Sequence, residues 1–428
     1  MLPRTRPASS SSRTQRVRDP WKIGRLSLLA AAQCRTRLAL RMIYAIQVLR
    51  GIAALLVMLY HYSDYLKPVI PGANIGFLLF AGGYAGVDIF YILSGFIIVH
   101  STDRVGHSNP VDFAIRRFFR VVPLAQLATV VYALILPIQP ESRLLWQSLL
   151  FAPRVDADPP KFGFPVVHQE WTLTYELIFY AIFASVLVFT HKRRVVASAL
   201  VILACVVGFQ WILGGPISPY PNGVFLPANS HGILSPEILG ELGNPIMLEF
   251  VFGMALAVAY SRAEGWLTTR CNPFAGRLVG LALAGLFLAS YFSRNDPGNG
   301  LLNKGFGAAC LVIGALFLEG SFRRLSAGKV GGMLLSCFLW LGAVSYPLYL
   351  VHLGISERLL RFLARHLLEL RVDGLWGFLA LIATSLVLAS TVHILVERRL
   401  IQVGKLLTGY RVRLLGRPET PKSAPLPP

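Results

Sequence analysis

Residues 47–62 read QVLRGIAALLVMLYHY, an apolar run with an arginine near its start and a histidine near its end. Apolar runs of about 18 to 25 residues can cross a bilayer as helices, and such runs recur along most of the 428 residues. Hydrophobic residues make up 54% of the chain and charged residues 14%, too few charges for a soluble surface of this size. The sequence therefore predicts an all-α integral membrane protein.

We predict about ten transmembrane helices, near residues 45–66, 83–101, 119–137, 170–190, 195–213, 245–261, 276–293, 304–320, 337–355 and 374–396. With the N-terminus in the cytoplasm, the connections after the even-numbered helices are cytoplasmic, and these connections are the basic ones. Residues 214–244, which this topology places outside, contain no Lys or Arg. Because positive charge is retained on the inner side, both termini are expected to be cytoplasmic and the protein to lie in the cell inner membrane.

One segment runs against this charge pattern. Residues 356–371, SERLLRFLARHLLELR, should lie outside but carry four arginines. Their leucines recur at helical spacing, which favours an amphipathic helix on the outer membrane surface. The alternative is an inverted hairpin of the last two spans.

The two ends of the chain differ from its middle. Residues 1–41 are Arg-rich with a Ser run, which is typical of a presequence or of a disordered cytoplasmic tail, or indicates that translation starts at Met42. Residues 42–400 form the transmembrane domain, and residues 401–428 a basic, Pro-rich cytoplasmic tail. We see no internal repeat.

The net charge of +20 does not indicate a nucleic-acid partner. The Lys and Arg residues lie mostly in short segments between apolar runs, where they face anionic membrane lipid rather than forming one basic patch. The five cysteines are scattered, without a CxxC pair or metal-ligand spacing. We therefore expect no metal site and no permanently bound cofactor.

The first span pairs a charged with a titratable side chain. Arg50 and His61 are eleven residues apart, which is three helical turns plus about 20°, so they share one face at an axial separation of about 16 Å. Taken singly, Arg50 could be a snorkelling anchor and His61 a helix-packing residue. Together they favour a functional site, since ionisable groups inside a membrane usually mark function.

Four further polar side chains are predicted in the outer half of the membrane. Asp88 lies at the outer end of the second span, and Glu176 in the fourth span reaches the depth of His61. A carboxylate beside an imidazole orients it and raises its basicity, although Glu176 could instead face an aqueous vestibule. Tyr346 and His352 follow in the ninth span, as candidates for the side of the site that an acceptor molecule would approach. His352 is close enough to the end of this span to lie at the membrane–water interface instead.

The third span opens with AIRRFFRVVPL at the cytoplasmic face. Arg117 and Arg120 share a helix face at i,i+3, an arrangement suited to bidentate capture of phosphate oxygens. The alternative is that these arginines only belong to the positive charge that membrane proteins keep on the cytoplasmic side.

Five fragments, LRGIAALLVMLYH, GVDIFYILSGFII, RRFFRVVPL, HQEWTLTYELIFY and VSYPLYLVH, occur in an order that resembles membrane acyltransferase family 3 over residues 44–400. The start of the chain is most similar to the exopolysaccharide-production branch. The resemblance implies an O-acyltransferase that uses cytoplasmic acetyl-CoA, with Arg50 and His61 as the family's Arg-x10-His pair and Arg117 and Arg120 as its Arg-x-x-Arg motif. The chain departs from the pattern at VERRL, where relatives often have a proline, which puts a role for Glu397 in doubt.

These arguments converge on a membrane enzyme that transfers an acetyl or short acyl group to a hydroxyl group. The acceptor would be a surface or exported polysaccharide or its lipid-linked precursor, and other polysaccharide-assembly proteins are candidate partners. Arg50, Arg117 and Arg120 would bind the donor phosphates, because an extended pantetheine arm of roughly 15–20 Å matches the helical rise to His61. His61 would be the general base or the acyl-accepting nucleophile, oriented by Glu176 or Asp88. The alternative is a secondary transporter or flippase in which the same groups form a proton relay.

Overall fold

The computed structural model describes residues 42–69, 74–103, 109–136, 141–153, 158–162, 166–227, 235–270, 272–293, 298–368 and 372–414. The chain divides into two units, residues 1–43 and 44–428, and the elements below all belong to the second. The basic segment 1–41 and the Pro-rich end beyond residue 414 lie outside the described residues.

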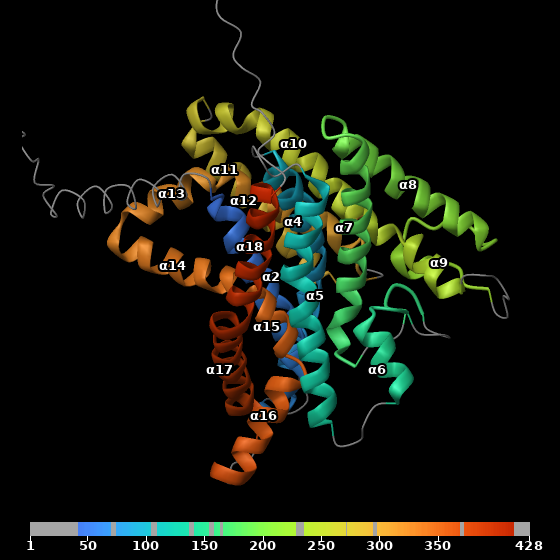
Figure 1. The fold of residues 1–428 in the computed structure, drawn as a ribbon. Helices are drawn as coiled ribbons and strands as arrows, with labels where there is room; N and C mark the ends of the chain where they lie inside the picture. Colours follow the sequence, from blue (N-terminus) through green and yellow to red (C-terminus); the bar gives the residue numbers. More distant parts are fainter. Residues whose placement is uncertain are drawn as a thin grey trace, which may run out of the picture. The chain divides into compact units, whose positions relative to one another are not determined.

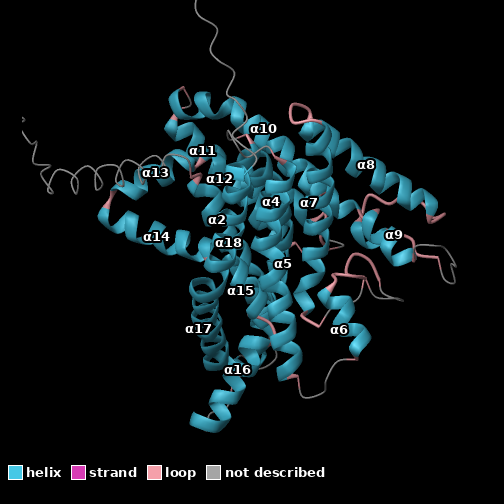
Figure 2. Cartoon of the chain, viewed as in Figure 1, coloured by secondary structure: helices cyan, strands magenta, loops and turns pink. Residues whose placement is uncertain are grey.

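Every regular element in the described ranges is helical (Figures 1 and 2). Eight stretches are long and apolar enough to span a membrane, or up to ten if each of two bent helix pairs is one span. The longest helix of each of the eight stretches is α2 (Tyr44–Tyr62), α4 (Ala85–Thr102), α5 (Pro110–Ile135), α7 (Trp171–Phe189), α8 (Arg194–Ile212), α10 (Leu248–Thr269), α11 (Pro273–Phe292) and α17 (Gly374–Val392). The predicted all-α membrane fold is confirmed, and the orientation of the termini stays a prediction.

Two spans that the sequence predicted as single helices are broken. The pairs are α12 (Lys304–Phe317) with α13 (Glu319–Ala327), bent by 50°, and α14 (Lys329–Ala343) with α15 (Ser345–Val351), bent by 55°. The second break has a local cause in Pro347. Its ring would clash with the carbonyl of Ala343, four residues earlier, so α14 cannot continue through this position.

Glycines let α4 lie very close to its two neighbours. A Cβ on Gly86 would stand 2.4 Å from the carbonyl oxygen of Ala53 in α2, and one on Gly95 would stand 2.2 Å from that of Phe250 in α10. Both glycines therefore allow a close helix contact that no side chain would permit. Gly342 of α14 is equally tight, 2.0 Å from the carbonyl of Gln47 in α2. These contacts fix α2 between α4 and α14.

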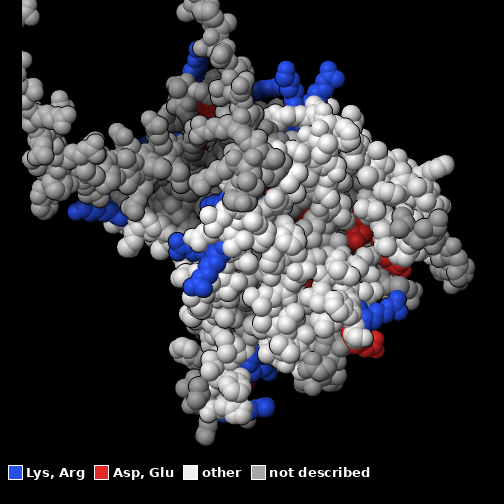
Figure 3. Space-filling model, viewed as in Figure 1, with Lys and Arg blue, Asp and Glu red and all other residues white. Residues whose placement is uncertain are grey.

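Helix α8 shows how the outer helices meet lipid. Its large apolar side chains Val196, Leu200 and Trp211 are exposed, the last to 75%. Much of the face in Figure 3 carries no charged side chain, as expected of helices whose outer surface contacts hydrocarbon.

The predicted amphipathic segment is helical, as α16 (Ile355–Leu363) and a π-turn over Ala364–Leu368. Glu357 pairs with Arg361 at 2.7 Å and accepts from Tyr65 at 2.6 Å, which ties α16 to the end of the first span. Which side of the membrane α16 occupies stays a prediction. After α17 the chain continues through a second π-turn (His393–Glu397) into α18 (Arg398–Leu414), so the last helix extends beyond the predicted end near residue 396.

Candidate active site

The centre of the site is a pair of hydrogen-bonded histidines. His61 lies in the last turn of α2, and His352 follows the last residue of α15. The Nε2 atom of His352 is 3.0 Å from the Nδ1 atom of His61. His352 is fully buried, while His61 keeps part of its surface accessible. The sequence proposed both residues separately, and the structure brings them together.

Hydrogen-bond partners fix which nitrogen of each ring carries a proton. The Nδ1 atom of His352 lies 3.1 Å from the carbonyl oxygen of Leu348 and 2.8 Å from that of Tyr349. Carbonyl oxygens only accept, so this Nδ1 is protonated. In the neutral ring Nε2 then holds a lone pair and accepts from His61 Nδ1–H. It follows that the Nε2 atom of His61 is unprotonated, the state that a base or a nucleophile requires.

The residues around His352 hold the end of α15 in place. The Tyr62 hydroxyl donates to the His352 carbonyl. Gln169 donates to the carbonyl of Leu350 at 2.7 Å, and the hydroxyls of Thr172 and Tyr349 share a hydrogen bond of 2.8 Å. Helix α2, the turn before α7 and α7 itself therefore hold the end of α15 that carries this histidine, which pre-organises the imidazole pair.

A third histidine lies beside the pair and was missed by the sequence reasoning. The ring centroid of His168 is 6.3 Å from that of His61, at an interplanar angle of 86°. His168 belongs to the short turn His168–Glu170 that precedes α7. The motif HQEWTLTYELIFY contains it, but its position just before the predicted span gave no sign that it would reach α2.

Neither predicted carboxylate contacts His61. Asp88 is fully buried at the start of α4 and accepts hydrogen bonds from Asn299 (2.6 Å) and the Gly300 amide (2.8 Å), with Glu249 of α10 beside it. These bonds hold the connection before α12 against α4. Among the described residues His61 instead contacts the ring of His352 and the backbone carbonyl of Val57.

Glu176 lies with the arginines. It accepts from the Ser94 hydroxyl at 3.0 Å and from the Tyr180 hydroxyl. The guanidinium of Arg117 lies over the Tyr180 ring, 5.3 Å from its centroid, which is within cation–π range. Glu176 therefore reaches Arg117 through Tyr180, on the same helix α7.

The three predicted donor arginines form one cluster. Arg50 donates to Ser345 at 3.1 Å, at the break between α14 and α15. It also interacts electrostatically with Arg120, Glu176 and Glu397. Arg120 interacts in the same way with Arg117. Three guanidinium groups facing two carboxylates leave an excess of positive charge, which favours an anionic ligand.

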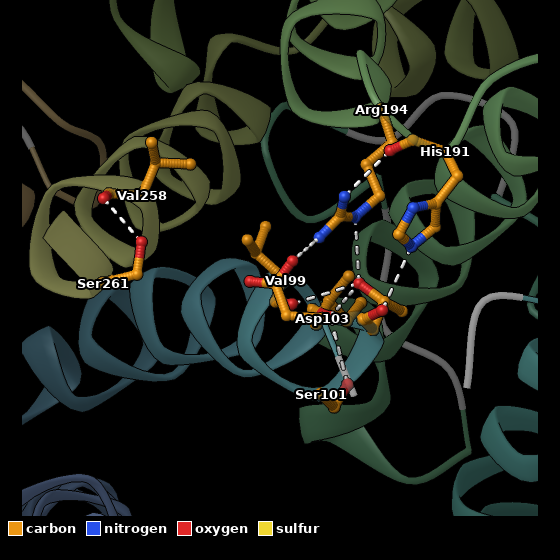
Figure 4. Close-up of polar contacts among 9 residues, drawn as sticks. Val99, Ser101, Asp103, His191, Arg194, Val258 and Ser261 are labelled. Atoms are coloured by element: carbon orange, nitrogen blue, oxygen red, sulfur yellow. Dashed lines mark hydrogen bonds and ion pairs between the residues drawn. The ribbon is translucent and has the colours of Figure 1, made fainter. Parts of the chain in front are cut away.

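Polar contacts at the end of α4, here called the polar clamp (Ser101, Thr102, Asp103 and Arg194), support the arginine cluster. Arg117 donates to the Ser101 hydroxyl at 3.3 Å. Two residues on, Asp103 forms an ion pair with Arg194, which also donates to Thr102 at 3.1 Å (Figure 4). The clamp fixes the end of α4 to the start of α8, and thereby places Ser101 beside Arg117.

Tyr346 and Glu397 also lie near the arginine cluster. Tyr346 follows Ser345 and donates to the carbonyl of Val121 at 2.6 Å, so it lies nearer the arginine cluster than the histidine pair. Glu397, which the sequence left in doubt, is 2% exposed and pairs with His393 across the π-turn. π-turns are frequent at functional sites.

The site has two chemically different ends on one helix. Arg50 at one end offers charge to an anion, and His61 at the other offers an unprotonated imidazole. Among the residues the structure describes, no group of three or more His, Cys, Asp or Glu side chains could hold a metal ion. The arrangement defines a membrane-embedded group-transfer enzyme.

Sequence comparisons agree with this class. Residues 43–394 match the family described as "Acyltransferase domain", acyltransferase family 3, so the chain belongs to that family and is an enzyme that transfers acyl groups. It is 33% identical over 279 residues to the "Exopolysaccharide production protein ExoZ" of Rhizobium meliloti (strain 1021), which covers 61% of this chain and 76% of that protein. It is 30% identical over 169 residues to the "Putative membrane-bound transacylase BcsY" of Komagataeibacter xylinus, covering 36% and 40%.

Replacing Arg117 with alanine should weaken binding of an anionic acyl donor. Loss of one charge-assisted contact costs about 1.5–3 kcal/mol, or about 10- to 150-fold in affinity. The apparent KM for the acyl donor should rise by this factor, with kcat partly recovered at saturation. Steady-state kinetics of the purified Arg117→Ala protein measure both. Arg324, an exposed arginine on α13, is the matched control, and an equal KM in both variants would exclude Arg117 from donor binding.

Proposed function

We propose that the protein transfers an acetyl or other short acyl group from cytoplasmic acetyl-CoA to a hydroxyl group of a surface or exported polysaccharide, or of its lipid-linked precursor. The observation that carries this proposal is the placement of the arginine cluster and the histidine pair at opposite ends of α2. The names of two relatives support the polysaccharide acceptor, since one is an exopolysaccharide production protein and the other a putative transacylase.

The donor would bind with its phosphates at Arg50, Arg117 and Arg120. From Arg50 to His61 the helix rises about 16 Å, which an extended pantetheine arm of similar length can span. The thioester then lies at His61 while the nucleotide stays at the cytoplasmic end, where charged oxygens remain hydrated. This length match supports a coenzyme A donor over a short acyl phosphate.

The chemistry starts from the unprotonated Nε2 of His61. As a general base, it takes the proton of the acceptor hydroxyl while that oxygen attacks the thioester carbonyl. The carbon–sulfur bond breaks, an ester forms, and the proton passes to the departing thiolate. As a nucleophile, Nε2 would first attack the thioester carbonyl, and the carbon–sulfur bond would break to release the coenzyme A thiolate and leave an acyl-imidazolium. The acceptor hydroxyl would then attack this acyl group, the carbon–nitrogen bond would break to free Nε2, and the hydroxyl proton would pass to the thiolate. In both routes His352 accepts the hydrogen bond from Nδ1–H and so stabilises positive charge on His61.

Two measurements test the proposal. Acetyl content of cell-surface glycans should be lower in cells without this protein, and should return with the wild-type chain but not with His61→Ala. The purified protein in lipid nanodiscs should bind acetyl-CoA and transfer its labelled acetyl group to glycan extracted from those cells. Equal acetyl content with and without the protein, together with no binding of acetyl-CoA, would contradict the proposal.

A further inference from the structure

His168 is a half-buried histidine beside the imidazole pair, and none of the roles above uses it. Its ring centre is 6.3 Å from that of His61, and the two rings are nearly perpendicular, at 86°. It also interacts electrostatically with His352. His61 and His168 both keep part of their surface accessible, whereas His352 is fully buried. A substrate that reaches His61 therefore lies close to His168.

The turn that carries His168 is fixed on both sides of this histidine. Val167 is 1% exposed, and its carbonyl accepts from the Glu170 amide at 2.9 Å. Gln169 is 2% exposed, and its side chain donates to the Leu350 carbonyl at 2.7 Å. Because both neighbours are buried and bonded, the position of His168 relative to α2 and α15 is set before any substrate binds. Such pre-organisation is what a catalytic contact requires.

Acyl transfer places negative charge on one particular oxygen. When the attacking atom bonds to the carbonyl carbon of the thioester, one electron pair of the carbon–oxygen double bond moves onto the oxygen. The pair returns to the double bond when the carbon–sulfur bond breaks. A hydrogen-bond donor already aimed at this oxygen stabilises the transition state, and this contribution is often the largest one to catalysis. The roles of His61 and His352 described above do not provide this donor.

The distance between the rings of His61 and His168 suits a carbonyl group held by both. A reacting carbon stands about 3 Å from the atom that attacks it, and a donor stands about 2.7–3.1 Å from the oxygen that becomes charged. Two groups that act on one carbonyl in these ways are about 5–7 Å apart. The ring centres of His61 and His168, 6.3 Å apart, have this spacing. His352 does not, because its Nε2 lies 3.0 Å from His61 and leaves no room for a carbonyl between them.

An imidazole is chemically suited to this contact. It carries one N–H group when neutral and two when protonated, so His168 can donate in either state. Lys161 interacts electrostatically with both His61 and His168. Its positive charge adds to the attraction for a developing oxyanion, and since Lys161 is exposed and screened by water, we expect this addition to be small.

We propose that His168 is a catalytic residue that donates a hydrogen bond to the carbonyl oxygen of the transferring acyl group while negative charge develops on it. Its proton stays on His168 throughout, and only the electron pair of the carbonyl group moves. The role is the same whether His61 acts as a base or as a nucleophile, because this oxygen becomes negative in both routes. The assignment rests on the proposed transfer from a thioester to a hydroxyl group, and it names the residue that stabilises the transition state of that step.

Four substitutions of His168 separate hydrogen-bond donation from packing and from base catalysis. His168→Ala and His168→Phe remove the donor, and each should lower kcat about 10²- to 10³-fold, the effect of removing one oxyanion donor. The KM for acetyl-CoA should stay unchanged. His168→Asn and His168→Gln place an amide N–H near one or the other ring-nitrogen position, and at least one of them should recover part of the lost rate. The assay is transfer of labelled acetyl from acetyl-CoA to extracted glycan by the full chain in nanodiscs.

Two results of this series would overturn the assignment. A residue needed only for packing would keep its rate in His168→Phe, which fills the same space. A residue that acts as a base would show no recovery in either amide variant, because an amide does not take up a proton at neutral pH. His366→Phe makes the matched change at an exposed position and should keep the wild-type rate.

Tyr60 is the competing donor, because its ring centre is 5.2 Å from that of His61. Tyr60→Phe removes only the hydroxyl group and should keep the wild-type rate. If Tyr60→Phe loses the rate and His168→Ala keeps it, the oxyanion contact belongs to Tyr60 and the assignment of His168 is wrong.

p-Nitrophenyl acetate tests the assignment without coenzyme A and without a glycan. Its carbonyl oxygen gains the same charge when it is attacked, and the release of p-nitrophenolate is followed by absorbance. The His168 variants should rank as in the transfer assay, and His61→Ala should be slow. If this ranking holds but no acetyl group passes from acetyl-CoA to glycan, the proposed function fails and the role of His168 stands. If wild type releases p-nitrophenolate no faster than His168→Ala, the role of His168 is overturned.

Discussion

Replacing His61 with alanine should abolish acyl transfer while acetyl-CoA remains bound. The imidazole acts on the transferring group, whereas the donor phosphates would be held about 16 Å away at the other end of α2. General acid–base groups contribute about 10²- to 10⁴-fold to rate, and loss of a covalent acyl carrier would cost more. Transfer of labelled acetyl and equilibrium binding of acetyl-CoA should be compared on the same preparation.

His366, an exposed histidine in the π-turn after α16, is the matched control, and His366→Ala should keep its activity. Incubating wild type with labelled acetyl-CoA and no acceptor distinguishes the two chemistries. Label retained on His61 after denaturation indicates a nucleophile, and its absence indicates a base. A near wild-type rate in His61→Ala would show that the reaction takes place elsewhere.

Replacing His352 with leucine should slow the reaction nearly as much. Loss of His352 removes the hydrogen bond that favours a proton on His61 Nδ1, so His61 can adopt the other tautomer, in which Nε2 carries the proton and cannot act as a base. We expect kcat to fall about 10²- to 10⁴-fold, the range by which acid–base groups and their orienting partners contribute. The KM for acetyl-CoA should not change.

A glutamine at position 352 provides the sharper comparison. Its amide oxygen can accept from His61 Nδ1–H, so His352→Gln should recover part of the rate that His352→Leu loses. A residue needed only for packing would show no such recovery, because both substitutions remove the same ring. Equal kcat values for the two variants would therefore argue against the tautomer role.

The sequence predicted those features that depend on spacing within one helix. Arg50 and His61 lie on one continuous helix, as their eleven-residue separation required. Helical periodicity fixes this relation locally, so no knowledge of the bundle was needed.

The sequence did not predict which side chains of different helices contact each other. Counting residues placed Glu176 at the depth of His61, but depth does not specify which neighbour a side chain faces, and Glu176 bonds with Ser94 and Tyr180. The pairing of His352 with His61 depends on the break before Ser345. Glu170 and Glu241, about seventy residues apart in sequence, line one small cavity only because α9 (Pro236–Leu242) returns to the start of α7.

The length of the short helix α15 sets the spacing between its two attachment points on α2. Ser345 at its first residue bonds with Arg50, and His352 just beyond its last residue bonds with His61, so α15 is fastened to α2 at both ends. Seven residues separate these two attachment points, which is about two helical turns and returns the side chains to the same face. One inserted or deleted residue would turn His352 by about 100° away from α2. The number of residues in this stretch is thus as strict a requirement as the identity of the two that bond.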